Sequence, residues 1–304
     1  MWKKSYRIAL RKRNNDFFWE DEDYSFCEFV PKSKRYWLAD PFIFEKDNRT
    51  YIFFEEYDRT KRKGRISFSE ITNDLITEPT KIIDESFHLS FPYVFEYNNE
   101  IYMLPETSCA NSLILYRAID FPYSWERRVV LKDIFCCDSI LLFDEKEPIG
   151  YIVSEMFKNP PNNKVFSCYV KNKFFRCNIL DEITSMPITL AEGDYGIRNA
   201  GAIFSYKGKM IRPGQDCSEG EYGKGVVFFE IDEIDVYKEH RIRTLSKDEI
   251  RDHLYRKNKR PLLGVHTYNI SEKYEIIDFS FMENYPLVYD FVFLLNIIKD
   301  FIKR

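Results

Sequence analysis

Glycine is scarce in this 304-residue chain, with 11 residues, and there is no apolar run long enough to enter a membrane. Few glycines and many aromatic residues favour packed strands over disordered linkers. The N-terminal stretch MWKKSYRIALRKRNNDFFW begins with basic residues but lacks the apolar run of a signal peptide or a membrane-spanning helix. We therefore expect a cytoplasmic protein.

Cysteines are few and show no CxxC spacing, and their number, 7, is odd. This pattern argues against a zinc site and against a framework of paired disulfides. A chain of this length can bury roughly 75% of the surface that its unfolded form exposes, so it needs neither for stability. We expect buried free thiols, no metal and no cofactor.

An excess of basic charge is also missing, since 45 Lys and Arg residues face 49 Asp and Glu residues. A nucleic-acid partner is therefore not expected. The sequence has no GxGxxG, Walker, GxSxG or HExxH motif, so nucleotide binding, serine hydrolysis and zinc proteolysis lack their usual marks. The GEYGKG stretch at 220–225 precedes a predicted strand rather than a helix, so we interpret it as a turn and not a phosphate-binding loop.

Aromatic residues, in contrast, make up 17% of the chain, and they lie in a strand–turn–strand pattern that recurs. The first copy reads ADPFIFEKDNRTYIFFEE and the second SFPYVFEYNNEIYMLPET, each with a polar turn between two apolar strands. Hairpins of this kind are predicted at 39–56, 90–107, 138–155, 199–216 and 264–281.

The spacing of the hairpins leaves room for two further strands per copy. Matching Phe44, Phe95, Phe143, Phe204 and Ile270 gives steps of 51, 48, 61 and 66 residues. Third strands are predicted at 65–71, 113–119, 165–177 and 225–239, and fainter fourth strands at 80–85 and 127–134. The pattern predicts an all-β fold, a five-bladed β-propeller over residues 1–284, because a closed ring leaves only short, protected strand edges. The alternative is a β-sandwich whose copies are similar by accident.

Two segments lie outside the repeat. Residues 246–261 begin with Ser246 ahead of two acidic residues and end at Pro261, which predicts a charged surface helix. Residues 285–304 predict a C-terminal amphipathic helix, interrupted by acidic residues too soon to span a membrane. This tail is expected to pack on the propeller or on a partner, with peripheral contact to a membrane surface as the alternative.

Polar residues open the inner strand of every predicted blade, at the end where a propeller gathers its ligands. Several carboxylates around one pocket raise each other's pKa, and cleavage of a glycosidic bond needs one protonated acid and one ionised partner. The pattern therefore favours an oligosaccharide or glycoconjugate substrate. The residues that open the blades are Asp40, His88 with Ser90, Asp138, Arg198 with Asn199, and His266; those that close the hairpins include Glu106, Arg212, Gln215 and Asp216.

Each of these residues also has a structural alternative. Asp40 precedes a proline and Asp138 opens a strand, so both are compatible with turn or capping roles. Glu106 is able to pair with a basic neighbour, and His266 to be a hydrogen-bonded core histidine. Asp216 is able to bind the amides of its own turn. We treat Glu55, Glu56 and Glu155 mainly as solvated or structural.

Several strings resemble a known domain: ADPF at 39–42, HLSFPYVFE at 88–96, YMLPET at 102–107, RPGQDC at 212–217 and HTYN at 266–269. They are similar to the propeller domain at the N-terminus of glucosamine inositolphosphorylceramide transferases and to its bacterial stand-alone relatives. That domain is similar in turn to the five-bladed glycoside hydrolases of families 43, 32 and 117. The resemblance implies catalytic roles for Asp40 and Asp138 and includes RNAG at 198–201 and the Tyr222–Gly223 pair.

The resemblance has limits. Family 43 takes its general acid from a Glu of blade four, where this chain has Arg198 and Asn199, and family 117 uses a His of blade five, which corresponds to His266. The WMNDPNG string of family 32 is absent. In the plant transferases, sugar transfer is attributed to a C-terminal domain that is absent here.

We therefore predict a glycan-active enzyme with Asp40 as base or nucleophile and Asp138 tuning the acid, a role for which Glu106 and His266 compete. The predicted substrate-binding residues are His88, Arg198, Asn199, Arg212, Gln215, Asp216 and Tyr222. The alternative is a saccharide-binding or scaffold module without chemistry of its own, acting with a partner glycosyltransferase.

Overall fold

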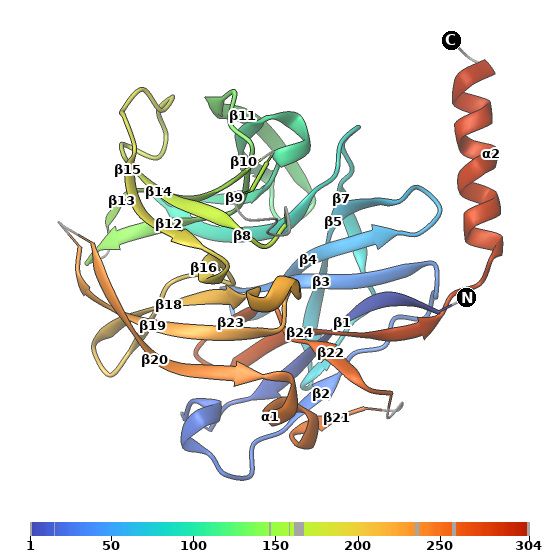
Figure 1. The fold of residues 1–304 in the computed structure, drawn as a ribbon, viewed down its shortest axis with the longest axis horizontal. Coiled ribbons are helices and arrows are strands. Elements are labelled where there is room, and N and C mark those ends of the chain that lie inside the picture. The colour runs from blue at the N-terminus through green and yellow to red at the C-terminus, as the bar shows by residue number, and fades with distance from the viewer. Residues whose placement is uncertain are drawn as a thin grey trace.

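The chain forms a five-bladed β-propeller with a C-terminal helix (Figure 1). The computed structural model describes residues 2–14, 16–145, 147–157, 159–160, 167–234, 237–256 and 260–302. Within this part of the chain the strands form five sheets that surround a common centre. The predicted fold is confirmed, and the sandwich alternative is wrong.

The first three blades follow one another along the chain, each starting at the centre of the ring. Blade one contains β3 (Tyr36–Lys46), β4 (Arg49–Asp58), β5 (Lys63–Thr72), β6 (Leu75–Ile76) and β7 (Thr80–Ile83). Blade two contains β8 (Ser90–Tyr97), β9 (Glu100–Glu106), β10 (Ser112–Asp120) and β11 (Ser124–Lys132). Blade three contains β12 (Cys136–Asp144), β13 (Glu147–Met156), β14 (Val170–Arg176) and β15 (Ile188–Gly193).

The last two blades complete the ring. Blade four contains β16 (Tyr195–Asn199), β17 (Phe204–Tyr206), β18 (Lys209–Asp216), β19 (Gly225–Glu233) and β20 (Lys238–Ser246). Blade five contains β1 (Trp2–Lys12), β2 (Phe26–Glu28), β21 (Leu254–Tyr255), β22 (Leu262–Gly264), β23 (Tyr268–Ile270) and β24 (Tyr274–Asn284).

Both ends of the chain contribute to blade five, and this closes the ring. β1 pairs antiparallel with β24 over its whole length, from Trp2↔Asn284 to Lys12↔Tyr274. The middle of β1 is buried on both faces, with Ile8 and Ala9 fully inaccessible, because neighbouring strands and blades cover it. The sequence analysis assigned no strand to residues 2–12, so this closure was missed.

The polar turns that separate the strands have the backbone that tight hairpins require. Asp47 and Asn48 have φ of 50° and 60°, and Asn98 and Asn99 have φ of 52° and 61°. Two consecutive left-handed residues match the right-handed twist of the flanking strands, and Asn and Asp tolerate this conformation better than most residues. These turns explain why the hairpins could be located in the sequence.

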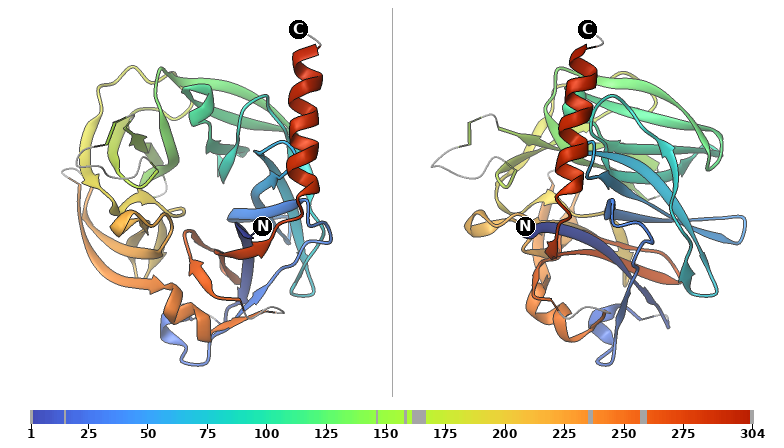
Figure 2. Two further views of the ribbon diagram at one scale, coloured as in Figure 1. Left: turned by 45° about the vertical axis from the view of Figure 1, so that its right-hand side comes forward. Right: turned by 90° about the vertical axis from the view of Figure 1, so that its right-hand side faces the viewer.

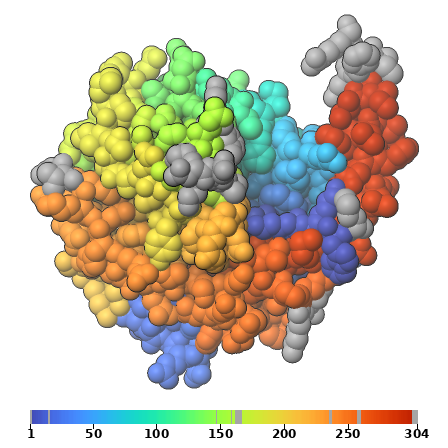
Figure 3. All heavy atoms as spheres, in the orientation of Figure 1, coloured from blue at the N-terminus to red at the C-terminus, as the bar shows by residue number. Residues whose placement is uncertain are grey.

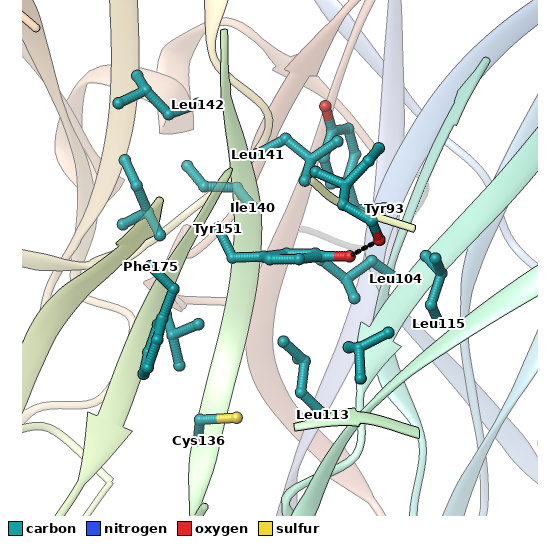
Figure 4. Close-up of a cluster of buried hydrophobic side chains, with 14 of the residues drawn as sticks. Tyr93, Leu104, Leu113, Leu115, Cys136, Ile140, Leu141, Leu142, Tyr151 and Phe175 are labelled. Carbon is teal, nitrogen blue, oxygen red and sulfur yellow. Dashed lines mark hydrogen bonds between the residues drawn. The ribbon is translucent and has the colours of Figure 1, made fainter. Parts of the chain in front are cut away.

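Apolar clusters between adjacent blades hold the ring together. The largest lies between blades two and three and contains Leu104, Leu115 and Ile140 (Figure 4). Tyr151 crosses this cluster, and its hydroxyl donates a 2.6 Å hydrogen bond to the buried carbonyl of Ile179. The polar end of a fully buried side chain is therefore satisfied inside an apolar core.

Removing that hydroxyl is expected to destabilise the ring. Tyr151→Phe leaves the Ile179 carbonyl without its partner, which costs about 1–3 kcal/mol of the free energy of unfolding. Urea denaturation measures the loss. Tyr169→Phe, which removes an exposed bond to Glu192, serves as the control and is expected to change stability by less than about 0.5 kcal/mol. Equal effects of the two substitutions would contradict this interpretation.

Two predicted elements need correction. The helix predicted at 246–261 is α1 (Lys247–Asp252), which begins at the Ser246 cap but gives way to β21, a strand paired with β2. The predicted strand at 225–239 is two strands, because the chain turns back between β19 and β20. Residues 165–166 of the predicted third strand of blade three and residues 257–259 of the predicted helix lie outside the described residues.

The C-terminal helix α2 (Val288–Ile302) projects at one side of the ring (Figures 1 and 3), and a view turned by 90° shows it in front of the blades (Figure 2, right). Asp290 ties it to the ring through Lys3 at 2.9 Å and Arg62 at 2.8 Å. Phe291 and Leu294 are more than half exposed. Contact of this tail with a partner glycosyltransferase or a membrane surface stays a prediction. None of the helices in the described ranges has the length and apolarity needed to cross a bilayer.

Candidate functional site

A pocket of about 330 Å³ opens where the inner strands meet at the centre of the ring. We call it the axial pocket. Six of the predicted site residues line it: Asp40, His88, Glu106, Arg198, Tyr222 and His266. They come from blades one, two, four and five, and blade three contributes Met156. Tyr6, Trp37, Glu55, Ser90, Ser108 and Ser167 are also in its wall. Residues from positions 6 to 266 therefore converge on one cavity.

The inner strands break their regular pairing where they reach this pocket. Register shifts occur between Ala39 and Phe42, between Ser90 and Tyr93, and between Cys137 and Ile140. Each shift contains a residue in the left-handed region: Asp40 with φ of 52°, Phe91 with 48° and Asp138 with 43°. The left-handed conformation costs about 1–2 kcal/mol per residue. Such strain persists where the surrounding structure imposes it, and it is common at functional sites.

Asp40 belongs to a chain of three titratable side chains. Its Oδ1 lies 3.2 Å from Nε2 of His266, and Nδ1 of His266 lies 2.6 Å from Oδ2 of Asp278. The oxygens of Asp278 accept hydrogen bonds from the backbone amides of Asp40, His266 and Thr267. Asp278 is therefore held by three backbone amides behind the pocket, and Asp40 and His266 are the two members of the chain that line it.

The two carboxyl groups of this chain differ in their acidity. Burial, the charge of Asp278 and the charge of Glu55 raise the pKa of Asp40 well above its usual value. Burial also raises the pKa of Asp278, but the charge and hydrogen bond of His266 and the backbone amides outweigh it and leave this pKa lowered. Asp40 therefore favours its protonated form, beside an Asp278 that favours its ionised form.

A second cluster is built around Arg198. Its guanidinium donates to Asp138, to Oε2 of Glu106 at 3.3 Å and to the carbonyl of Ser167 at 3.0 Å. Burial raises the pKa of Asp138 to about 7, opposed by the charge of Arg198 and reinforced by Glu106. Asp138 is 1% exposed and does not line the pocket, so Arg198 and Glu106 separate it from the cavity.

Glu55, which the sequence analysis treated as structural, lies in the pocket wall. It is 4% exposed, and its Oε1 is buried without a hydrogen-bond partner among the described residues. Burial and the charges of Glu106 and Asp278 raise its pKa well above the usual value. A raised pKa favours the protonated form of the Glu55 carboxyl group, which makes this group a candidate proton donor.

His88 lies beside Glu55, with Nε2 3.4 Å from Oε1. The backbone amide of Gly64 donates to Nδ1 of His88 at 2.9 Å, which leaves the ring proton on Nε2, facing Glu55. Burial and the charge of Lys63 lower the pKa of His88 to about 4, so the ring is neutral at pH 7. A Cβ at Gly64 would come within 2.4 Å of Oε1 of Glu55. Gly64 is therefore required because the side chain of Glu55, on the neighbouring strand β4, lies against its backbone in β5.

Four predicted substrate-binding residues do not line the pocket. Gln215 donates to Oδ2 of Asp138 at 2.8 Å, and Asn199 donates to the carbonyl of Asp138 at 2.8 Å. Arg212 is 1% exposed and pairs with Glu239 at 2.6 Å, and Asp216 accepts the amide of Ser218. These contacts support the wall behind Asp138 and Arg198, and direct ligand contact by these four residues stays a prediction.

Three clusters in the described residues have ligand atoms close enough to share an ion: Asp40 with His266 and Asp278, Glu106 with Cys137 and Asp138, and Glu230 with Asp232 and His240. The third is at the surface, and the first two are buried. Their best oxygens are already used, by three amides at Asp278 and by Arg198 and Gln215 at Asp138. Hydrogen bonds and an ion pair therefore already occupy carboxylate oxygens of both buried clusters.

Solved structures with the same architecture belong to glycoside hydrolases. The catalytic domain of an α-L-arabinofuranosidase of family 62 from Coprinopsis cinerea is 8% identical, with a TM-score of 0.59 over 90% of this chain and 97% of that domain. An endo-arabinase from Bacteroides thetaiotaomicron is 14% identical, with a TM-score of 0.52 over 71% of this chain and 84% of that protein. At this identity the likeness establishes the fold.

Sequence relatives are closer. The chain is 34% identical over 221 residues to glucosamine inositolphosphorylceramide transferase 1 of Arabidopsis thaliana, which covers 71% of this chain and 26% of the plant protein. It is 33% identical over 206 residues to the protein of that name from Oryza sativa subsp. indica. The chain thus spans about a quarter of the length of these relatives. The model of the family described as glucosamine inositolphosphorylceramide transferase 1, N-terminal, matches residues 29–293, and the chain belongs to that family.

Proposed function

We propose that this chain acts on a glycan, cleaving or transferring a glycosyl unit in the axial pocket. The observation that carries the proposal is the chain of Asp40, His266 and Asp278 in a pocket whose wall also holds Glu55, a buried carboxyl group whose Oε1 has no hydrogen-bond partner among the described residues. Glycosidic bond chemistry requires one carboxyl group that donates a proton and one that accepts a proton or attacks. The name of the plant relatives, which refers to a glucosamine transferase, supports a place in glycan biosynthesis.

In this proposal Asp40 is the base or nucleophile. Its proton passes to Nε2 of His266, and the imidazolium that forms is stabilised by the ionised Asp278 on the other ring nitrogen. The Asp40 carboxylate then removes a proton from the attacking hydroxyl, or attacks the sugar itself. A water molecule as acceptor gives hydrolysis, and a sugar hydroxyl gives transfer.

Glu55 is our candidate for the general acid. It would give its proton to the glycosidic oxygen as the bond between that oxygen and the sugar breaks. Glu106, which the sequence analysis favoured for this role, accepts from Ser108 at 2.7 Å and from Arg198 at 3.3 Å. Because both of its oxygens are already acceptors, Glu106 is better suited to hold sugar hydroxyls than to donate a proton.

The experiment that tests the proposal is turnover by the wild-type protein. Glucosamine and N-acetylglucosamine glycosides, as α- and β-anomers, are incubated with the protein alone and with sugar acceptors, and products are identified by mass spectrometry. Release or transfer of a sugar supports the proposal. Saccharide binding by calorimetry without any turnover would instead favour the rival function, a binding module that acts with a glycosyltransferase.

Glu55→Gln is expected to lower turnover by about 10²–10⁴-fold, the usual contribution of a general acid. Wild-type activity should fall as the pH rises through the raised pKa of Glu55, because only the protonated form donates, and the variant should lose this alkaline limb. Steady-state kinetics across the pH range measure both effects. Glu56→Gln is the control, because Glu56 binds Arg65 and Ser67 away from the pocket. An unchanged pH profile in Glu55→Gln would exclude Glu55 as the acid.

We also propose a cytoplasmic location. Every cysteine is a free thiol, a state that a reducing compartment maintains. Fractionation of the source cells would test this proposal.

A further inference from the structure

A second pocket, of about 240 Å³, adjoins the axial pocket and differs from it in charge. We call it the cationic pocket. Trp37 lines both cavities, so the two share a wall. The residues that line the cationic pocket are Lys3, Lys4, Trp37, Tyr57, Arg59, Arg62 and Tyr285.

The four basic residues of this pocket are only partly neutralised. Lys3 and Arg62 share one carboxylate, that of Asp290, at 2.9 Å and 2.8 Å. Arg59 pairs with Glu283 at 2.6 Å, but Glu283 is also bound by Arg7 at 3.2 Å. Arg7 also pairs with Glu28 at 2.6 Å. Three carboxylates therefore face the four basic residues of the pocket and Arg7, which leaves a formal net charge of plus two.

Two of the basic groups retain unused hydrogen-bonding capacity. The side chain of Arg59 is 3% exposed, and its Nε has no hydrogen-bond partner in the described part of the chain. Lys4 has no carboxylate within ion-pair distance among the described residues, and its Nζ donates to the carbonyl of Tyr222 at 3.1 Å. A buried N–H without an acceptor is costly to a fold, and an incoming anion would relieve that cost.

Lys4 also joins the two cavities. Its Nζ lies 5.1 Å from the ring centre of Tyr6 and 5.6 Å from that of Tyr222, and both tyrosines line the axial pocket. Beside it, Trp37 stacks on Tyr57 with centroids 4.4 Å apart and planes 9° apart. A ligand that extends from the axial pocket past Trp37 would enter a pocket lined by the Lys4 ammonium group and the guanidinium groups of Arg59 and Arg62.

We propose that the cationic pocket binds a phosphate group attached to the sugar that occupies the axial pocket. A phosphate ester carries up to two negative charges, which match the net charge of the pocket, and Arg and Lys are the residues that bind such groups. The proposal rests on the proposed function for the sugar and on the cationic pocket for the phosphate. A sugar phosphate in solution and the phosphodiester headgroup of a glycolipid share this chemistry.

The test is calorimetric binding of glucose and glucose 1-phosphate to the full chain. We expect the phosphate ester to bind at least about tenfold more tightly, since hydrogen bonds between charged groups are stronger than those between neutral groups. Lys4→Gln should remove most of this preference, and added salt should weaken it. Lys12→Gln is the matched control, the same substitution at the exposed far end of the same strand, where Lys12 pairs with Asp74.

Equal affinity for the two sugars, or a preference that persists in Lys4→Gln, would overturn the proposal. Two further probes identify the source of the phosphate. Inositol 1-phosphate represents a sugar phosphate in solution, and vesicles of phosphatidylcholine with phosphatidylinositol represent a lipid headgroup. The probe whose binding is weakened by Lys4→Gln identifies the source. Asp40→Asn separates this inference from the proposed function. The Asp40→Asn variant should lose turnover but still bind glucose 1-phosphate more tightly than glucose. If the wild type turns over none of the substrates, the proposed function fails, but a preference for the phosphate ester that depends on Lys4 would still support this inference.

Discussion

Asp40→Asn is expected to lower turnover of the best glycoside substrate by about 10²–10⁴-fold, the contribution of a positioned acid–base group, while saccharide affinity changes little. The amide preserves the local contacts, because its oxygen accepts from the Phe91 amide as Oδ2 does and its NH₂ donates to Nε2 of His266. It removes the titratable proton of Asp40. A loss confined to kcat, with KM maintained, would show that the carboxyl group acts in the chemical step.

The same substitution is expected to stabilise the fold at neutral and alkaline pH. Between the unfolded pKa of about 3.9 and the raised folded pKa, the folded wild type retains a proton that the unfolded chain has released. Its free energy of unfolding therefore falls by about 1.4 kcal/mol per pH unit over this range, and the asparagine variant lacks this loss. Urea denaturation near pH 5 and pH 8 measures the difference.

Asp144→Asn provides the control for both effects, since Asp144 is the exposed last residue of β12. It should keep wild-type turnover and an unchanged pH dependence of stability. If Asp40→Asn is instead destabilised most strongly at alkaline pH, the fold holds the carboxylate form of Asp40, and the assignment of a protonated Asp40 is wrong.

Local signals explain why the blades could be predicted from the sequence. Turns such as KDN and YNNE require consecutive left-handed residues, and Asp and Asn supply them where hairpins form. The blade-opening residues Asp40, Arg198 and His266 were identified for a related reason, because a polar residue in an apolar strand is conspicuous. All three line the axial pocket.

Long-range contacts explain what was missed. β1 has no hairpin partner next to it in the sequence, and only the closed ring pairs it with β24. Glu55 lies within an otherwise apolar strand beside Glu56, and the sequence does not distinguish the glutamate that faces the pocket from the one that binds Arg65. Asp278 and Lys4 act through partners more than ten residues away, so their roles depend on geometry that no local pattern encodes.

Arg198 is the residue whose loss we expect to destabilise the protein most. Arg198→Met leaves Asp138 and Glu106 facing each other in the interior without their cation. Removing one partner from a buried ion pair costs about 3–5 kcal/mol, because an uncompensated charge remains. Arg117→Met, which breaks two exposed pairs with Glu100 and Glu126, is the control and should cost less than about 1 kcal/mol.

The pH dependence of this loss identifies its cause. The charge of Arg198 opposes the rise in the pKa of Asp138, which reaches about 7 through burial, so without Arg198 that pKa should rise further. The wild type loses stability from Asp138 up to about pH 7, whereas the variant should continue to lose it at higher pH. Urea denaturation near pH 5, 7 and 9 should therefore show a deficit that grows with pH. Adding Asp138→Asn should recover part of it, since one buried carboxylate is then gone. A deficit that is constant with pH and unaffected by the second substitution would mean that Arg198 stabilises the ring by packing alone.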